Sequence, residues 1–256
     1  MFKKILLGLL GLVVLLVGAF LALFGPMFIG TVPLKDGQEL GELKIRTIQD
    51  GYVAVYLVPI NETSVALVDC GNDPAGAAIM TELKRRNLTA DAVTAIFITH
   101  GHPDHVAACD QFPRARIYGF EGDARQAAGE VRFKGPMTSR VDLPADKRIK
   151  FTDLLTDGTP VDVGGVTVTP YLVPGHTAGS AGFLVGGVLM LGDSAALKND
   201  GTVPAPWVVT DDPAQNVRSL KALHEKLKPL GTVKTLAFAH SGPVDGLEAL
   251  AHAYGN

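Results

Sequence analysis

The chain has 256 residues, of which 47% are hydrophobic and 19% are charged, and its formal net charge is −3 at pH 7. A domain of this length can bury a large core, whereas the slightly acidic balance argues against nucleic-acid binding, which requires a basic face. With 29 Gly and 16 Pro, the chain is rich in turns, which favours many short strands joined by loops.

The chain opens with an apolar segment. Lys3 and Lys4 precede residues 5–24, which carry no charge. At a rise of about 1.5 Å per residue, a helix of this length spans a hydrocarbon core of about 30 Å. We therefore expect an uncleaved transmembrane signal anchor over residues 1–30 and a folded domain over residues 31–256. A cleaved signal peptide, which would leave a secreted domain, is the alternative.

The two lysines also predict the orientation of the anchor. Positive residues tend to stay on the cytoplasmic side, which places the domain in the periplasm or outside the cell. The chain contains two cysteines, Cys70 and Cys109. In an oxidising compartment they can pair if their Cα atoms lie within about 7 Å. Buried, unpaired thiols are the alternative that we favour.

Strands and one helix are predicted in the next part of the chain. β-Branched residues indicate strands at residues 43–48, 53–59 and 65–68. A helix is expected over residues 74–86, with Asp73 as its N-cap and Pro74 in its first turn.

Residues 99–105 carry the strongest functional signal. They read Thr-His-Gly-His-Pro-Asp-His and follow a predicted strand over residues 93–98. Four potential metal ligands fall here: His100, His102, Asp104 and His105. Neutral imidazoles and a carboxylate are ligands that zinc prefers, and the intervening glycine and proline favour a loop. The sequence therefore predicts a metal site at this strand end, followed by a short helix over residues 105–109.

Three later residues stand in similar places, beside the ends of apolar runs: His176, Asp193 and His240. Further strands are predicted over these ranges: 166–173, 182–185, 188–191 and 233–239. Potential ligands placed repeatedly at strand ends indicate convergence on one rim. A helix is expected from Asp212 to about Lys228, with Pro213 at its start.

Two features near these motifs each have two alternative roles. Trp207 is assigned either to packing or to the wall of a substrate pocket. Residues 131–151, which lack clear periodicity, either cover the site or form a plain surface loop.

The ordered motifs resemble those of the metallo-β-lactamase superfamily. They are the H-x-H-x-D-H stretch, Gly-His-Thr at 175–177, Gly-Asp-Ser at 192–194 and the late His240, and Asp69 matches the superfamily's first motif. The similarity runs from about Ile45 to Pro243. It implies an α/β fold, a four-layer αββα sandwich with a two-metal centre.

The resemblance also implies a role for each candidate residue. The first metal is assigned to His100, His102 and His176, and the second to Asp104, His105 and His240. Asp193 is assigned to bridge both metals. Asp69 is expected to brace the metal loops without binding metal itself.

The implied activity is metal-dependent hydrolysis of a small molecule: an ester, thioester, lactone or phosphodiester. Two divalent ions are expected, zinc first and iron or manganese as alternatives, with a shared hydroxide as nucleophile and Asp104 holding its proton. Asp193 speaks against β-lactams, because true β-lactamases of the superfamily lack an aspartate there. Glyoxalase II enzymes usually have a second histidine shortly after the Gly-His-Thr, where this chain has Ser180. Quorum-quenching lactonases have a tyrosine three residues beyond the bridging aspartate, where this chain has Ala196.

Two other classes of function stay open. An iron-dependent oxidoreductase of the sulfur dioxygenase type keeps similar motifs. A catalytically silent, membrane-tethered binding protein would usually lack a ligand, and all seven are present here.

Overall fold

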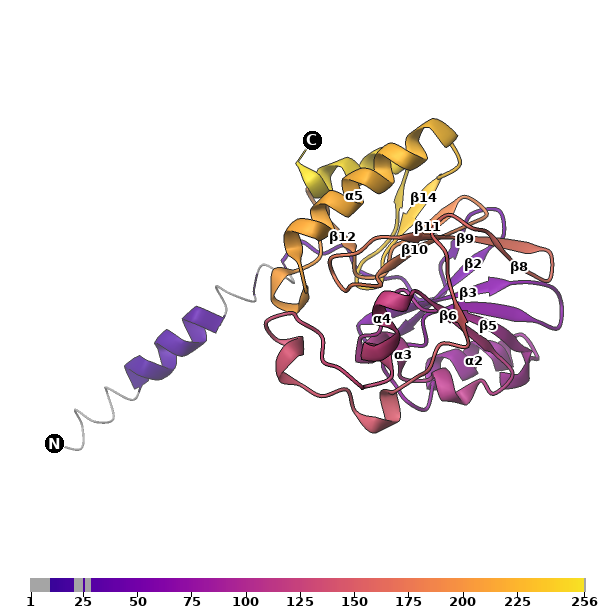
Figure 1. Cartoon of the computed structure of the whole chain (residues 1–256), viewed down its shortest axis with the longest axis horizontal. Coiled ribbons are helices and arrows are strands. Elements are labelled where there is room, and N and C mark those ends of the chain that lie inside the picture. The colour runs from indigo at the N-terminus through magenta and orange to yellow at the C-terminus, as the bar shows by residue number, and fades with distance from the viewer. Residues whose placement is uncertain (1–9, 21–24, 26–28, 256) are drawn as a thin grey trace.

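The structure, a computed structural model of the chain, describes residues 10–20, 25 and 29–255 (Figure 1). Residues 10–20 are helical, whereas residues 5–9 and 21–24 of the expected anchor lie outside the described residues. Within the described ranges, no helix is both long and apolar enough to cross a membrane. The anchor therefore stays a prediction.

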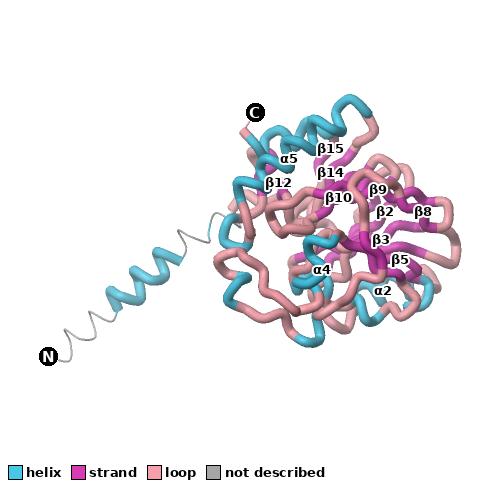
Figure 2. The backbone as a smooth tube through the Cα atoms, in the orientation of Figure 1, coloured by secondary structure: helices cyan, strands magenta, loops and turns pink. Residues whose placement is uncertain are grey.

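Two β-sheets stacked face to face form the centre of the molecule (Figures 1 and 2). The first, in spatial order, contains β1 (Glu39–Leu40), β2 (Ile45–Asp50), β3 (Val53–Pro59), β4 (Val65–Val68), β5 (Val93–Phe97), β6 (Arg116–Gly119) and β7 (Asp153–Leu154). The second contains β15 (Val244–Asp245), β14 (Thr235–Ala237), β11 (Val188–Met190), β10 (Ala181–Val185), β9 (Val166–Leu172) and β8 (Val161–Val163). A separate hairpin joins β12 (Ala195–Lys198) to β13 (Gly201–Pro204).

Strand β3 shows why the first sheet is covered on both faces. Ala54, Tyr56 and Val58 belong to the core between the sheets, and Val55 and Leu57 belong to the core beneath α2 (Ala77–Arg85). Successive side chains of a strand point to opposite faces, so a continuous apolar strand needs cover on both. Helix α2 supplies the outer cover.

Helix α5 (Pro213–Leu227) covers the outer face of the second sheet (Figure 1). Its buried stripe of Leu220, Leu223 and Leu227 packs there together with residues of the 3-10 segment η7 (Leu247–Tyr254). The helix begins at Asp212 and Pro213, as predicted, and the Asp212 carboxylate caps it by accepting a hydrogen bond from the backbone N–H of Gln215. The order helix, sheet, sheet, helix confirms the expected αββα sandwich.

Two helix boundaries differ from the prediction. Helix α2 begins at Ala77, because the Asp73 carboxylate accepts hydrogen bonds from the N–H groups of Ala75 and Ala77 and Gly76 adopts φ +61°. Asp73 thus caps a turn that precedes the helix, and Pro74 lies in that turn. Strands β3 and β4 have the predicted bounds.

The helix expected over residues 105–109 begins earlier. Helix α3 (Pro103–Val106) starts at Pro103, whose fixed φ suits the first turn of a helix. Asp104 and His105 therefore lie on a helical turn, whereas His100 and His102 precede it. A second, short helix that the sequence did not predict, α4 (Glu121–Ala127), follows β6.

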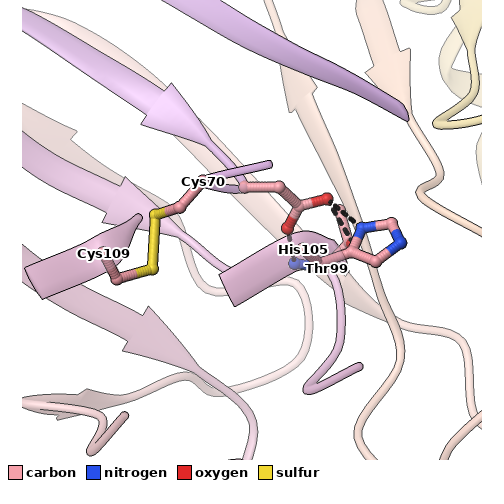
Figure 3. The surroundings of a disulfide bond; sticks show 5 residues. Cys70, Thr99, His105 and Cys109 are labelled. Atoms are coloured by element: carbon pink, nitrogen blue, oxygen red, sulfur yellow. Dashed lines mark hydrogen bonds and ion pairs between the residues drawn. A yellow bond between two sulfur atoms is a disulfide. The ribbon is translucent and has the colours of Figure 1, made fainter. Parts of the chain in front are cut away.

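The preference for unpaired thiols was wrong. Cys70 and Cys109 form a disulfide with their Cα atoms 5.4 Å apart (Figure 3). The end of β4 and the chain around α3 are held together by two backbone hydrogen bonds, from Cys70 N to His105 O at 2.7 Å and from Ala107 N to Gly71 O at 3.1 Å. This pairing, which local sequence does not encode, brings the thiols into range.

Candidate metal centre

The candidate ligands gather because several strands end at one rim. β4, β5 and β6 are parallel neighbours, as are β11 and β14, so their carboxyl ends meet at the same edges. Hydrogen bonds across the two sheets align these edges, from Ala181 N to Thr99 O at 2.8 Å and from Ala54 N to Ala239 O at 2.8 Å. The structure brings all seven predicted ligands into two adjacent clusters.

The first cluster contains three buried imidazoles, those of His100, His102 and His176, together with Asp193, which also faces the second cluster. His100 Nε2 lies 3.0 Å from His102 Nδ1, and His176 Nε2 lies 3.1 Å from both. Burial holds the pKa values of His100 and His176 well below the usual value and lowers that of His102 to about 4. These rings are therefore neutral at pH 7.

The second cluster consists of Asp104, His105 and His240. His240 Nε2 lies 3.5 Å from Asp104 Oδ2, and His105 Nε2 lies 3.8 Å from Asp104 Oδ1. Burial opposes a positive charge here, yet Asp193 raises the pKa of His240 to about 9 and that of His105 well above its usual value. Asp193 thus favours positive charge at this cluster, which a bound cation would supply.

Asp193 lies between the two clusters. Its Oδ2 is 3.6 Å from His176 Nε2 and 3.9 Å from His100 Nε2, in the first cluster. Its Oδ1 is 3.1 Å from His240 Nε2 and 3.3 Å from His105 Nε2, in the second. One carboxylate thus presents one oxygen to each group of ligands, which is the geometry that a bridging ligand requires.

Fixed partners set the tautomers in the first cluster. The Thr99 hydroxyl donates to Asp69 Oδ2 at 2.7 Å and therefore accepts from His100 Nδ1 at 3.1 Å. The Thr210 hydroxyl donates to Pro206 O at 2.7 Å and accepts from His176 Nδ1 at 3.2 Å. Both Nε2 atoms are left with lone pairs that face each other, a repulsive arrangement that a cation relieves.

In the second cluster, too, fixed hydrogen-bond partners set the tautomers of the histidines. His105 Nδ1 donates to Asp69 Oδ2 at 2.8 Å, and His240 Nδ1 donates to the backbone carbonyl of Tyr52 at 3.0 Å. The Tyr52 ring stacks on His240 with ring centroids 5.6 Å apart. In both rings Nε2 is directed at the carboxylates. The donor set, imidazole nitrogens with carboxylates, fits zinc and similar divalent ions.

Asp69 lies behind the ligands rather than among them. It is 2% exposed, and its carboxylate accepts hydrogen bonds from His105 Nδ1 and from the N–H and hydroxyl of Thr99. Its backbone adopts φ +64°, a left-handed conformation that is uncommon outside glycine. Such strain is retained where the surroundings fix it, often at functional sites.

Sequence reasoning missed Asp123, on α4. Burial raises the pKa of this carboxyl to about 6, although it accepts hydrogen bonds from Gly101 N at 2.8 Å, Thr177 Oγ1 at 2.7 Å and Gly179 N at 2.6 Å. It thus joins the loop of His100 and His102 to the loop of His176. A Cβ on Gly179 would lie 2.5 Å from Asp123 N, so this approach requires glycine. No local motif marks Asp123.

Residues 131–151 reach the first cluster. The ring of Phe133 meets that of His102 edge to face, with centroids 4.5 Å apart. This favours the covering role over the plain surface loop. Trp207 is 51% exposed, which excludes a buried packing role.

Comparisons with known proteins agree with this geometry. The chain is 29% identical to the protein YobT of Bacillus subtilis over 68% of this chain and 78% of that protein. It is 31% identical to a hydroxyacylglutathione hydrolase of Pseudomonas fluorescens over 48% of this chain but only 40% of that protein. Its fold is similar to that of the metallo-beta-lactamase family protein TTHA1429 of Thermus thermophilus, with a TM-score of 0.58, 24% identity and coverage of 80% and 77% of the two chains.

The family model of the metallo-beta-lactamase superfamily matches residues 48–240. This range contains Asp69 and all seven candidate ligands. The chain therefore belongs to the metallo-beta-lactamase superfamily and is a metallo-hydrolase.

Proposed function

We propose that this chain is a two-cation hydrolase of small ester or thioester substrates, with zinc as the metal. The position of Asp193, with one oxygen facing each cluster, carries this proposal. Held there, two divalent cations would act as Lewis acids and generate a hydroxide nucleophile at neutral pH. The relative named as a hydroxyacylglutathione hydrolase supports acyl substrates.

The chain's own residues position and move protons in this scheme. Asp69, Thr99 and Thr210 fix the tautomers of His105, His100 and His176, respectively, so that the Nε2 atoms of these three rings point inward. The Asp104 side chain is 19% exposed and lies beside His240. A carboxylate oxygen of Asp104 can therefore accept the proton of an attacking water. Lactones and phosphodiesters are the further substrates to test.

The test uses the full chain, purified in detergent and supplied with zinc, manganese or iron. We expect about two metal ions per chain by elemental analysis and turnover on thioester or ester substrates. Fewer than about one ion per chain in a folded, metal-replete preparation would overturn the two-cation centre. Oxygen uptake on a persulfide by the iron-loaded protein, without hydrolysis, would favour the sulfur dioxygenase class instead.

We also propose that the domain works in the periplasm or outside the cell, tethered by the apolar segment over residues 5–24. The Cys70–Cys109 disulfide supports an oxidising compartment, and Lys3 and Lys4 support a cytoplasmic N-terminus. Digestion of intact spheroplasts by added protease, followed by the mass of the mature N-terminus, tests both points. A protected domain would contradict the location, and a new N-terminus near residue 20 would indicate cleavage.

A further inference from the structure

A cavity of about 230 Å³ opens beside the first cluster. Its apolar walls include the side chains of Phe133, Met137, Val141, Leu143 and Val209, and His102 also lines it, against the ring of Phe133. We propose that this cavity binds an apolar, uncharged group of the substrate, of the size of a phenyl ring or a short branched alkyl chain. This inference rests on the proposed hydrolase function and names its substrate class.

The volume suits such a group. An apolar cavity of about 150 Å³ is large enough to bind benzene. The cavity beside His102 is larger than that. It can therefore hold an aromatic ring without expansion of its walls.

Hydrogen bonds hold the wall of residues 133–143 in place. The N–H groups of Lys134 and Gly135 donate to Asp211 Oδ1 at 2.7 and 2.8 Å, and Met137 N donates to Val208 O at 2.9 Å. A Cβ on Gly135 would lie 2.9 Å from the carbonyl carbon of Val209, so the two walls meet closely. Asp211 N in turn donates to His176 O at 3.0 Å, which ties the wall to the ligand loop.

The charges around the cavity disfavour anionic substrates. Among the described residues that line it, the only basic side chain is that of His102, whose ring faces the other imidazoles of the first cluster. The other ionisable group is Asp142, whose carboxylate is exposed and paired with Arg132 at 2.6 Å. A carboxylate entering this cavity would lose its hydration, and no lysine or arginine lines the described walls to receive it, which is costly.

The kinetic test uses N-acetylcysteamine thioesters of acetate, butyrate, succinate and phenylacetate, with thiol release as the readout. We expect kcat/KM for the phenylacetyl thioester to exceed that for the acetyl thioester by about 10- to 100-fold, because burial of one apolar group contributes this much. The succinyl thioester, which adds a carboxylate to a chain of nearly butyryl length, should react at least about tenfold more slowly than the butyryl thioester. Equal values across the series would overturn the proposal.

Two variants test whether the preference for the phenylacetyl group arises in this cavity. Val209→Phe fills the cavity and should reduce the phenylacetyl-to-acetyl ratio to within about threefold of unity. Val131→Phe makes the same change at an exposed position of residues 131–151, outside the cavity lining, and should leave the ratio unchanged. An unchanged ratio in Val209→Phe would overturn the assignment of this cavity.

A binding measurement separates this inference from the hydrolase proposal. In protein labelled with ¹³C at the methionine methyl groups, benzyl alcohol should shift the Met137 signal, and Val209→Phe should abolish the shift. A shift without any thioester hydrolysis would support the cavity and reject the proposed reaction. Hydrolysis without a shift and without acyl preference would reject the cavity alone.

Discussion

The two ligand clusters differ in charge and in exposure, although they share Asp193. The first holds three buried, neutral imidazoles and adjoins an apolar cavity. The second holds a carboxylate and two imidazoles with raised pKa values, and the Asp104 and His240 side chains are 19% and 31% exposed. The first cluster is therefore sheltered by protein, and the second meets solvent.

The two clusters are also held in place by different sets of hydrogen bonds. Buried threonine hydroxyls orient the first cluster, and Asp123 ties its two loops together. The Tyr52 carbonyl and the Cys70–Cys109 disulfide support the second, and Asp69 supports both, through His105 directly and through Thr99 to His100. Substitutions in one set should affect its own cluster first.

Loss of a central ligand should have the largest effect. Asp193→Ala removes the oxygens that face both clusters, and His176→Ala removes one of three nitrogens from the first. We expect kcat/KM to fall by about 1,000-fold or more, since several kcal/mol of charge stabilisation are lost, while circular dichroism shows a retained fold. Rates near wild type in either variant would show that the ligand assignment is wrong.

His240→Ala should separate the clusters. Its side chain belongs to the solvent-facing cluster, so the first cluster should keep its cation and metal content should fall from about two ions per chain to about one. Elemental analysis after dialysis against a weak chelator measures this. His252→Ala, at an exposed position, is the matched control and should retain both ions. Loss of both ions from His240→Ala would contradict independent clusters.

Removal of the disulfide should weaken the second cluster and the fold. Cys70 and Cys109 are 39 positions apart, and closure of a loop of this size contributes about 4 kcal/mol in the chain-entropy estimate. We expect the double variant Cys70→Ser/Cys109→Ser to lose a comparable free energy of unfolding in urea titrations and to release its solvent-facing cation first. Equal stability of the oxidised wild type and the double variant would refute this.

Substitution of Glu82, which lies outside both clusters, should change the free energy of unfolding without affecting the metal site. Burial opposes its charge, but hydrogen bonds from Arg85 and Arg86 lower its pKa to about 2. Because the pKa is depressed in the folded state, the stabilisation is present above the usual value of 4.5 and is lost as pH falls toward 2. Glu82→Gln should cost about 2–3 kcal/mol at pH 7, and the difference from wild type should shrink in acid. Metal content should not change, and a pH-independent difference would argue against this ion cluster.

Asp123→Asn should give the smallest effect. The amide group of asparagine cannot accept from all three donors, so one hydrogen bond to a ligand loop is lost at a cost of about 1–2 kcal/mol. We expect kcat/KM to fall about tenfold with metal content retained, and amide exchange to increase at Gly101 or Gly179. A variant that loses its cations instead would show that Asp123 does more than position the loops.

The sequence predicted the parts of the site that follow from local order. The H-x-H-x-D-H stretch, the strands over Val53–Pro59 and Val65–Val68 and the capped helix at Asp212 are encoded by neighbouring residues. Asp123 was missed because its role arises only where α4 crosses two distant loops. The disulfide was missed because it depends on pairing between the end of β4 and the chain after α3.

The hydrogen bond from His240 to Tyr52 has a consequence for engineering. The acceptor is the main-chain carbonyl, so every amino acid at position 52 can supply it, while the ring stacked on His240 is free to vary. A saturation library at position 52 should therefore change the surface beside the second cluster while the hydrogen bond keeps the His240 ring in its orientation. Laboratory evolution toward new substrates has a natural starting point there.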